Sequence, residues 1–174
     1  ISFGMQDDPN RIGYEWAAHS IYPKRADKQF FRTTVGNEQC LQPYSASIYN
    51  ISAMSYGALS KTAISSLNKG AQLGGFAHNT GEGGISDFHL EGGDLIWQIG
   101  TGYFGCRNDD GTFSEQLFAE KTSFPQVKMI EVKLSQGAKP GHGGLLPGEK
   151  NTPEIAKIRN IQPHIAVHSP AGHT

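Results

Sequence analysis

Cysteine is scarce in this chain, and neither sign of charge is in excess. Two cysteines among 174 residues, Cys40 and Cys106, are too few for a disulfide scaffold and form no CxxC metal motif, although they could still pair with each other. The formal net charge is -1, and the lysines and arginines are scattered, which argues against nucleic acid or an anionic membrane as a partner. We expect a reducing, cytoplasmic compartment, and any anion site must be built from a few local charges and backbone N–H groups.

Long apolar runs are missing as well. No stretch is long enough to span a bilayer, and the N-terminus has neither the basic start nor the apolar core of a signal peptide. The chain does not begin with methionine, so we expect it to be a truncated part of a longer gene product. Its length still suffices for one sizeable domain with a core of its own.

Glycine, unlike cysteine, is abundant in this chain. There are 22 glycines in 174 residues, well above the usual roughly 7%, and most lie between Gly70 and Gly148. They follow no period, which excludes collagen. Short glycine clusters between strand-like runs indicate either backbone that approaches a ligand or tight turns between strands and helices.

Strand-like runs alternate with helical segments along most of the chain. A short strand is predicted at 30–35, and four further strands are predicted at 47–54, 76–79, 127–134 and 165–168. Helices are predicted at 61–72, with Ser60 as N-cap, at 114–122, and at 153–160, with Thr152 as N-cap. On the first helix, Ala63, Leu67 and Ala71 share one face.

This alternation favours an α/β fold with a parallel sheet. The four later strands end in glycine-rich or polar loops, as the strands of a (β/α)8 TIM barrel do, and such a barrel needs roughly 250 residues. We therefore predict about the first half of a barrel over residues 47–174. Residues 1–46 are predicted to form an N-terminal lead-in segment that packs outside the main core.

The first candidate site is the run Asn79-Thr80-Gly81-Glu82-Gly83-Gly84. Glycines on both sides of Glu82 would let the backbone turn sharply and present N–H groups to an anion or a ring edge. Glu82 would then be a lone carboxylate in a polar rim, able to bind an amine or water. The alternative is an ordinary turn between a strand and a helix.

The second candidate site follows the strand at 127–134. Lys133 lies near the strand end, and Gln136 and Lys139 follow in the loop. Two ammonium groups and an amide suit a site that stabilises negative charge, such as a reduced flavin ring or a dicarboxylate. The alternative is that both lysines are solvated, which is a weaker reading for Lys133 because a buried strand offers little solvent.

The remaining polar candidates are less specific. Taken alone, Arg159 reads as a surface residue, although its guanidinium would bind a carboxylate in a bidentate pair if it faced the site. His164, His168 and His173 match no zinc spacing, so no metal site is predicted. Cys40 and Cys106 lie in no Cys–His motif and are predicted to be core or incidental cysteines.

Several strings together resemble the FMN-binding, 2-oxoglutarate-aminating domain of glutamate synthases, in particular the stand-alone bacterial and archaeal relatives. The resemblance covers about residues 47–174, and its most specific part is the string that runs from Lys133 through Gln136 and Lys139 to Gly141. The strings are ISAMSYGALS at 51–60, NTGEGG at 79–84, GYFG at 102–105, EVKLSQGAKPGHGG at 131–144, LPG at 146–148 and IAKIR at 155–159.

The resemblance implies a TIM-barrel oxidoreductase that makes L-glutamate by hydride transfer from FMN to 2-iminoglutarate. It places Ser52, Ala53, Met54 and Ser55 along the FMN ring and gives Lys133 and Gln136 contacts with the flavin. It assigns 2-oxoglutarate and its imine to Gly81, Glu82, Gln136, Lys139 and Arg159, with Lys139 and Glu82 as catalytic residues.

The chain also departs from the family pattern. His142 and Leu145 stand where the family commonly has Glu and Gln, and neither cysteine corresponds to the ligands of the family's iron-sulfur cluster, which we expect in the full-length protein. The loops for the FMN phosphate are expected outside this chain, and the sequence indicates no glutaminase part and thus no amide-derived source of ammonia. The electron donor is not indicated by the sequence.

Two alternatives follow from these departures. One is a related FMN enzyme with another amino or keto acid substrate, similar to an N-methylglutamate synthase subunit. The other is a piece that is inactive without its missing half. A half barrel would leave a parallel sheet edge exposed, so we expect a homo-oligomer or association with the missing half.

Overall fold

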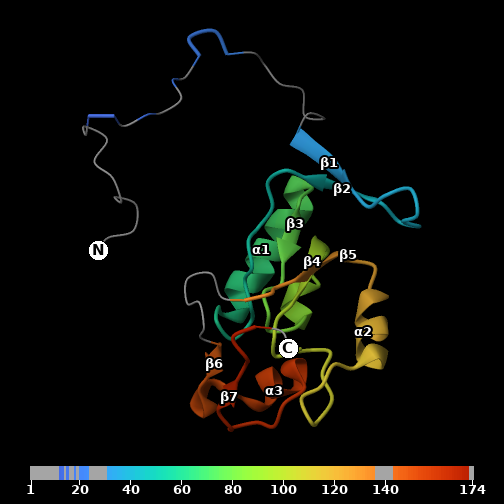
Figure 1. The fold of residues 1–174 in the computed structure, drawn as a ribbon, viewed down its shortest axis with the longest axis vertical. Helices are drawn as coiled ribbons and strands as arrows, with labels where there is room; N and C mark the ends of the chain where they lie inside the picture. The colour runs from blue at the N-terminus through green and yellow to red at the C-terminus, as the bar shows by residue number, and fades with distance from the viewer. Residues whose placement is uncertain are drawn as a thin grey trace. The chain divides into compact units, whose positions relative to one another are not determined.

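The computed structural model describes residues 12, 13, 15, 18, 20–23, 31–135 and 143–172. The chain divides into two units, Ile1–Phe30 and Phe31–Thr174, and the helices and strands shown in Figure 1 belong to the second. The predicted domain boundary after residue 46 stays a prediction. None of the helices in the described ranges has the length and apolar character needed to cross a bilayer.

An antiparallel hairpin opens the second unit. Strands β1 (Arg32–Val35) and β2 (Tyr44–Ser47) pair over their whole length. Arg32 Nη1 donates to the Gly75 carbonyl at 2.8 Å, and the Tyr44 hydroxyl donates to Asp94 Oδ2 at 2.7 Å. These two contacts attach the hairpin to the points where the next strands of the main sheet begin.

Helix α1 (Lys61–Gly74) forms where it was predicted and runs slightly further. The Ser60 hydroxyl accepts from the Ala63 N–H, and Gly75 ends the helix in the left-handed conformation, at φ 65°. The residues buried on α1 are Ile64, Asn68 and Ala71, whereas the prediction named the face of Ala63, Leu67 and Ala71. The helix is turned this way because Asn68 Oδ1 accepts the buried Gly93 N–H at 2.9 Å.

The main sheet has three parallel strands in the order β3-β4-β5. They are β3 (Ala77–Asn79), β4 (Asp94–Ile99) and β5 (Val127–Val132). The strand predicted at 47–54 is reduced to a parallel bridge between Ile51 and His78, and its first residue, Ser47, belongs to the hairpin. The Ile51 segment still lies beside β3, with its N–H bonded to the Ala77 carbonyl at 2.9 Å.

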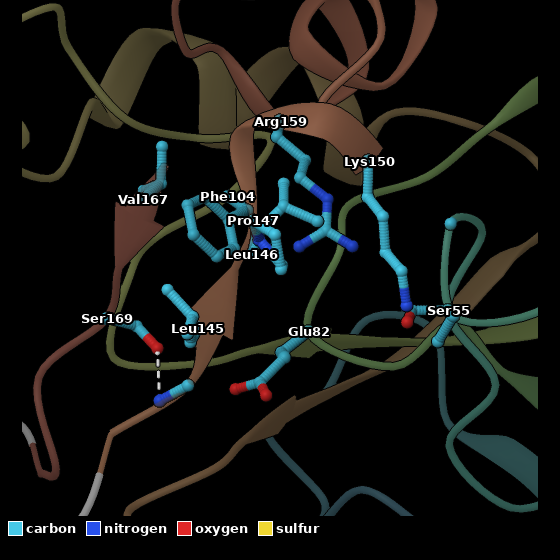
Figure 2. Close-up of a pocket in the computed structure, with 13 residues that line it drawn as sticks. Ser55, Glu82, Phe104, Leu145, Leu146, Pro147, Lys150, Arg159, Val167 and Ser169 are labelled. Carbon is cyan, nitrogen blue, oxygen red and sulfur yellow. Dashed lines mark hydrogen bonds between the residues drawn. The ribbon is translucent and has the colours of Figure 1, made fainter. Parts of the chain in front are cut away.

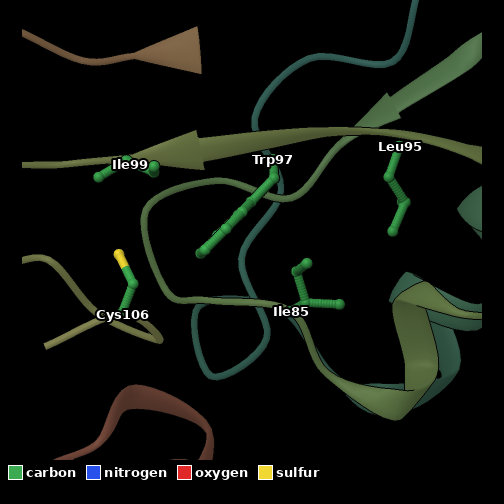
Figure 3. Packing of buried hydrophobic residues seen from close by; sticks show 5 residues of the cluster. All are labelled: Ile85, Leu95, Trp97, Ile99 and Cys106. Carbon is green, nitrogen blue, oxygen red and sulfur yellow. The ribbon is translucent and has the colours of Figure 1, made fainter. Parts of the chain in front are cut away.

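Strand β4, which the sequence analysis missed, carries the core. Leu95, Trp97 and Ile99 point from one face of β4 toward Ile85 and Cys106 (Figure 3), and all five are buried. This alternation is the two-residue period of a strand. The prediction that Cys106 is a core cysteine is confirmed, while Cys40 is exposed.

Two further helices flank the sheet. Helix α2 (Glu115–Thr122) begins one residue after the predicted start, with Ser114 as its N-cap, and its Phe118 ring stacks on Trp97 with the centroids 5.6 Å apart. Helix α3 (Pro153–Arg159) begins at Thr152, whose hydroxyl accepts from the Ile155 N–H at 3.3 Å, and its last residue is Arg159.

The last predicted strand forms, but its pairing differs from the prediction. Strand β7 (Val167–His168) lies antiparallel to the short strand β6 (Leu145–Leu146), so it is not a fourth parallel strand. The Ser169 N–H donates to the Gly144 carbonyl at 3.0 Å and extends this pairing. The structure is therefore a mixed α/β fold with a parallel sheet, and the half barrel remains a prediction.

The packing of Trp97 yields the first testable prediction. Trp97→Ala removes a fully buried ring and leaves a cavity, so we expect the free energy of unfolding to fall by about 3–5 kcal/mol. Urea denaturation followed by circular dichroism measures the change. Leu73→Ala is the matched control, since Leu73 is 89% exposed on α1 and should change stability by less than about 0.5 kcal/mol. Equal losses for the two variants would contradict the assigned core.

Candidate active site

The candidate site lies where the strands of the parallel sheet end. The Ile51 segment, β3, β4 and β5 run in the same direction, so their carboxyl ends meet at one edge of the sheet. The chain continues from these four ends into Ser55, Glu82, Gly100 and Lys133. Parallel α/β folds place ligands at this edge because the loops there are free to carry function.

Glu82 and Lys133 form an ion pair at this edge. Lys133 Nζ lies 3.2 Å from Glu82 Oε1, and both side chains are about one-quarter exposed, at 27% and 25%. A solvated Lys133 is therefore the wrong reading. Gly100 lies against the same carboxylate, because a Cβ there would lie 2.5 Å from Glu82 Oε2. The loops after three strands thus converge on Glu82.

A second carboxylate holds the loop that carries Glu82. Glu131 Oε2 accepts from Asn79 Nδ2 at 2.5 Å and from Gln98 Nε2 at 2.6 Å. Asn79 Oδ1 in turn accepts the Gly81 N–H at 2.9 Å, and Gly81 has a φ of 65°, which favours glycine. The predicted turn is therefore anchored from three neighbouring strands, which fixes where Glu82 leaves the sheet.

Arg159 is buried, which corrects its reading as a surface residue. Its side chain is 7% exposed, and its guanidinium lies 5.2 Å from the centre of the Phe104 ring. Nη2 donates to the Tyr56 carbonyl at 3.4 Å. A Cβ on Gly83 would lie 3.0 Å from the same nitrogen, so the glycine beside Glu82 makes room for the guanidinium.

Arg159 keeps its positive charge although its side chain is buried. Burial lowers the pKa of Arg159, and the nearby Glu82 carboxylate raises it. An arginine starts from so high a pKa that it stays protonated. Arg159 Nε is buried and has no hydrogen-bond partner among the described residues. A buried guanidinium with spare donors is suited to binding an anion.

Arg159 and Glu82 face a common cavity of about 250 Å³ (Figure 2). That volume is below the roughly 300–1,000 Å³ of sites for drug-sized ligands, and it suits a small acid. The sequence analysis assigned no role to three of the residues that line the cavity, although Phe104 lies within the GYFG string and Lys150 follows the LPG string closely. They are Phe104, Lys150 and Ser169.

The predicted flavin segment is held in a defined position. Met54 N–H donates to the Asn79 carbonyl at 3.1 Å, and the Met54 carbonyl lies 2.9 Å from His89 Nε2. His89 Nδ1 accepts the Ser86 N–H at 3.2 Å, so the ring proton is on Nε2 and Met54 is the acceptor. The buried His89 ring therefore fixes the end of the Ile51 segment.

The residues present fit the ring of an FMN. Ser52 and Ala53 are exposed just before Met54, where the segment ends at the sheet edge. Lys133 reaches the same edge from β5, and its ammonium suits the negative charge that a reduced flavin carries. A flat ring could thus lie on the Ser52–Ser55 backbone with a cation beside it.

Part of the predicted site cannot be placed. Gln136, Lys139 and His142 lie outside the described residues, and their assigned roles stay predictions. Within the described ranges, no three His, Cys, Asp or Glu side chains gather as a metal site requires.

Known proteins similar to this chain include several glutamate synthases. Residues 23–174 match the family profile described as a conserved region in glutamate synthase. The chain is 46% identical over 139 residues to a glutamate synthase large subunit-like protein of Bacillus subtilis, an alignment covering 78% of this chain and 26% of that protein. It is 42% identical over 122 residues to an archaeal-type glutamate synthase (NADPH) of a Thermotoga species, covering 70% and 22%.

A further relative extends the match along the chain. The archaeal glutamate synthase (NADPH) of Methanocaldococcus jannaschii is 34% identical over 166 residues, which is 95% of this chain and 29% of that protein. The chain therefore spans about a quarter of the length of these relatives.

The buried histidine beside this site predicts how stability depends on pH. Burial, with a smaller effect from the neighbouring His89, lowers the pKa of His78 to about 4. The unfolded chain then binds more protons between about pH 6.5 and pH 4, so the free energy of unfolding falls as the pH drops through that window, by up to about 3 kcal/mol.

His78→Leu tests this expectation. Neither ring nitrogen of His78 has a hydrogen-bond partner among the described residues, so leucine can replace the ring, and the variant should lose much of the slope. His168→Gln removes an exposed histidine and should keep it. Urea denaturation at several pH values measures the slopes, and identical slopes for all three proteins would contradict the assignment.

Proposed function

Because the chain belongs to the glutamate synthase family, we propose that it carries part of the active site of an FMN-dependent oxidoreductase that forms L-glutamate from 2-oxoglutarate. The family resemblance predicted from the sequence strings is confirmed by the match over residues 23–174. The activity of the whole protein is a proposal, since this chain spans about a quarter of its relatives. We also propose that the parallel sheet is part of a (β/α)8 barrel.

The observation that carries the proposal is that buried Arg159 and Glu82, which is paired with Lys133, line one small cavity. Lys133 offsets the charge of Glu82, so the guanidinium of Arg159 is available for an anionic substrate. The Phe104 ring on one side and the glycines on the other hold that guanidinium in place. A rigid, desolvated cation binds a carboxylate better than a mobile surface cation does.

Each residue then has a role in the amination. Arg159 binds and orients a carboxylate of 2-oxoglutarate. Ammonia condenses at the keto carbon to give 2-iminoglutarate and water, and the protonated imine carries a positive charge. Glu82 stabilises that charge. Lys139 stays the predicted second catalytic residue, with Gly81 and Gln136 as further substrate contacts.

The same edge would hold the cofactor. Ser52, Ala53, Met54 and Ser55 would support the ring, with Lys133 and the predicted Gln136 beside it. FMN, when bound, would supply the hydride that converts the imine carbon into the amine carbon of glutamate. His89 keeps the Met54 carbonyl in place, so the ring support does not move during the reaction.

The direct test is glutamate formation by the chain. Purified chain, FMN, dithionite as reductant, ammonium and 2-oxoglutarate are incubated, and L-glutamate is measured by chromatography. Glutamate that depends on all components supports the proposal. Methylamine in place of ammonium tests the N-methylglutamate synthase-like alternative. FMN that binds with no amine product of either kind would contradict the proposed reaction.

Arg159→Lys provides the third testable prediction. Lysine keeps the charge but loses the planar, bidentate donors, so we expect 2-oxoglutarate to bind about 10–100-fold more weakly. Calorimetric titration measures the affinity. Arg107→Lys is a matched control, because Arg107 also lies over the Phe104 ring, at 5.7 Å, but does not line the cavity. Comparable losses in both variants would point to a structural role for the stacked arginines instead.

A further inference from the structure

Lys150 comes to the cavity from an element separate from the parallel strands. It is the last residue of a short 3-10 turn, Gly148–Lys150, that follows β6. Its N–H donates to the Pro147 carbonyl at 3.0 Å. Figure 2 shows its side chain running toward Ser55, while the Arg159 guanidinium enters from α3.

The next residue fixes the backbone of Lys150. Asn151 is fully buried, and its Nδ2 donates to the carbonyls of Gln162 at 2.7 Å and Ile165 at 2.9 Å. The Asn151 N–H also bonds back to the turn, at 3.1 Å from the Gly148 carbonyl. The backbone of Lys150 is therefore fixed, although its ammonium remains in contact with solvent.

The charges around the cavity add up to a site for a dianion. The charged residues among its described lining are Glu82, Lys150 and Arg159. Glu82 is paired with Lys133, which leaves the two cations of Arg159 and Lys150 without a matching pair of negative charges in the lining. A ligand with two carboxylates neutralises both cations, whereas a monocarboxylate leaves one without a counter-ion.

We propose that Lys150 binds the distal carboxylate of a 2-oxo dicarboxylic acid and so determines specificity for dicarboxylates. This inference rests on the proposed function. Glu82 is assigned to the substrate nitrogen, and Arg159 is the cation coupled to Glu82, so Arg159 takes the carboxylate next to the keto carbon. Lys150, whose side chain runs toward Ser55 (Figure 2), takes the far one.

The test compares two ligands on three variants by calorimetric titration of the chain with FMN present. The ligands are 2-oxoglutarate and 2-oxobutanoate, which lacks the distal carboxylate. Lys150→Met should raise the Kd for 2-oxoglutarate about tenfold, the loss of one charge-assisted hydrogen bond, and the Kd for 2-oxobutanoate less than about twofold. Lys150→Arg should restore most of the preference.

Lys157→Met is the matched control, an exposed lysine on α3 that does not line this cavity, and it should leave both affinities unchanged. A Lys150→Met chain with unchanged preference for 2-oxoglutarate would overturn this inference and leave the proposed function standing. A wild-type chain that binds FMN but neither acid would overturn the proposed substrate site itself, and the inference with it.

Discussion

The site depends on a buried positive charge held against an aromatic ring. Arg159 lies on Phe104 and is kept in place by the small residues Gly57 and Gly83, whose missing Cβ atoms leave the guanidinium its space. An arginine is costly to bury unless its charge is compensated, and the nearby Glu82 carboxylate, which is also paired with Lys133, supplies only part of that compensation. A bound acid would complete this compensation, so the burial of Arg159 and its proposed role have the same physical origin.

The parallel sheet supplies the rigid frame for that charge. Its strands end at one edge, and the buried side chains of Asn79 and Gln98 bind the Glu131 carboxylate and so tie three neighbouring strands together just below the glycine loop. His89 does the same for the segment that ends at Met54. Binding groups on loops become precise only when the loops themselves are anchored, and hydrogen bonds from buried polar side chains provide that anchoring here. The three sets of contacts therefore place a cation, a carboxylate and a flat backbone surface around one small volume.

Local signals in the sequence predicted the helices well. The features that these signals missed depend on contacts between residues far apart in the chain. Helix α1 was predicted because a serine that caps its start and a glycine that ends it directly flank the helix. Strand β4 was missed because Ile96 joins Leu95 and Trp97 into a short continuous apolar run, which periodicity alone does not identify as a strand. The family resemblance assigned both Glu82 and Lys133 to the site but not their ion pair, and the burial of Arg159 depends on Phe104, which is distant in sequence. The antiparallel pairing of β7 depends on a partner only two residues long, Leu145–Leu146, and such a strand carries no pattern of its own.

The central claim is that the cavity beside Arg159 receives a small dicarboxylic acid. The most direct measurement is a crystal structure of the chain grown with FMN and 2-oxoglutarate. We predict one carboxylate within hydrogen-bonding distance of the Arg159 guanidinium, the keto carbon facing Glu82, and the flavin ring on the Ser52–Ser55 backbone. Density for the acid at another place, with Arg159 still stacked on Phe104 and the cavity filled only by water, would contradict the account.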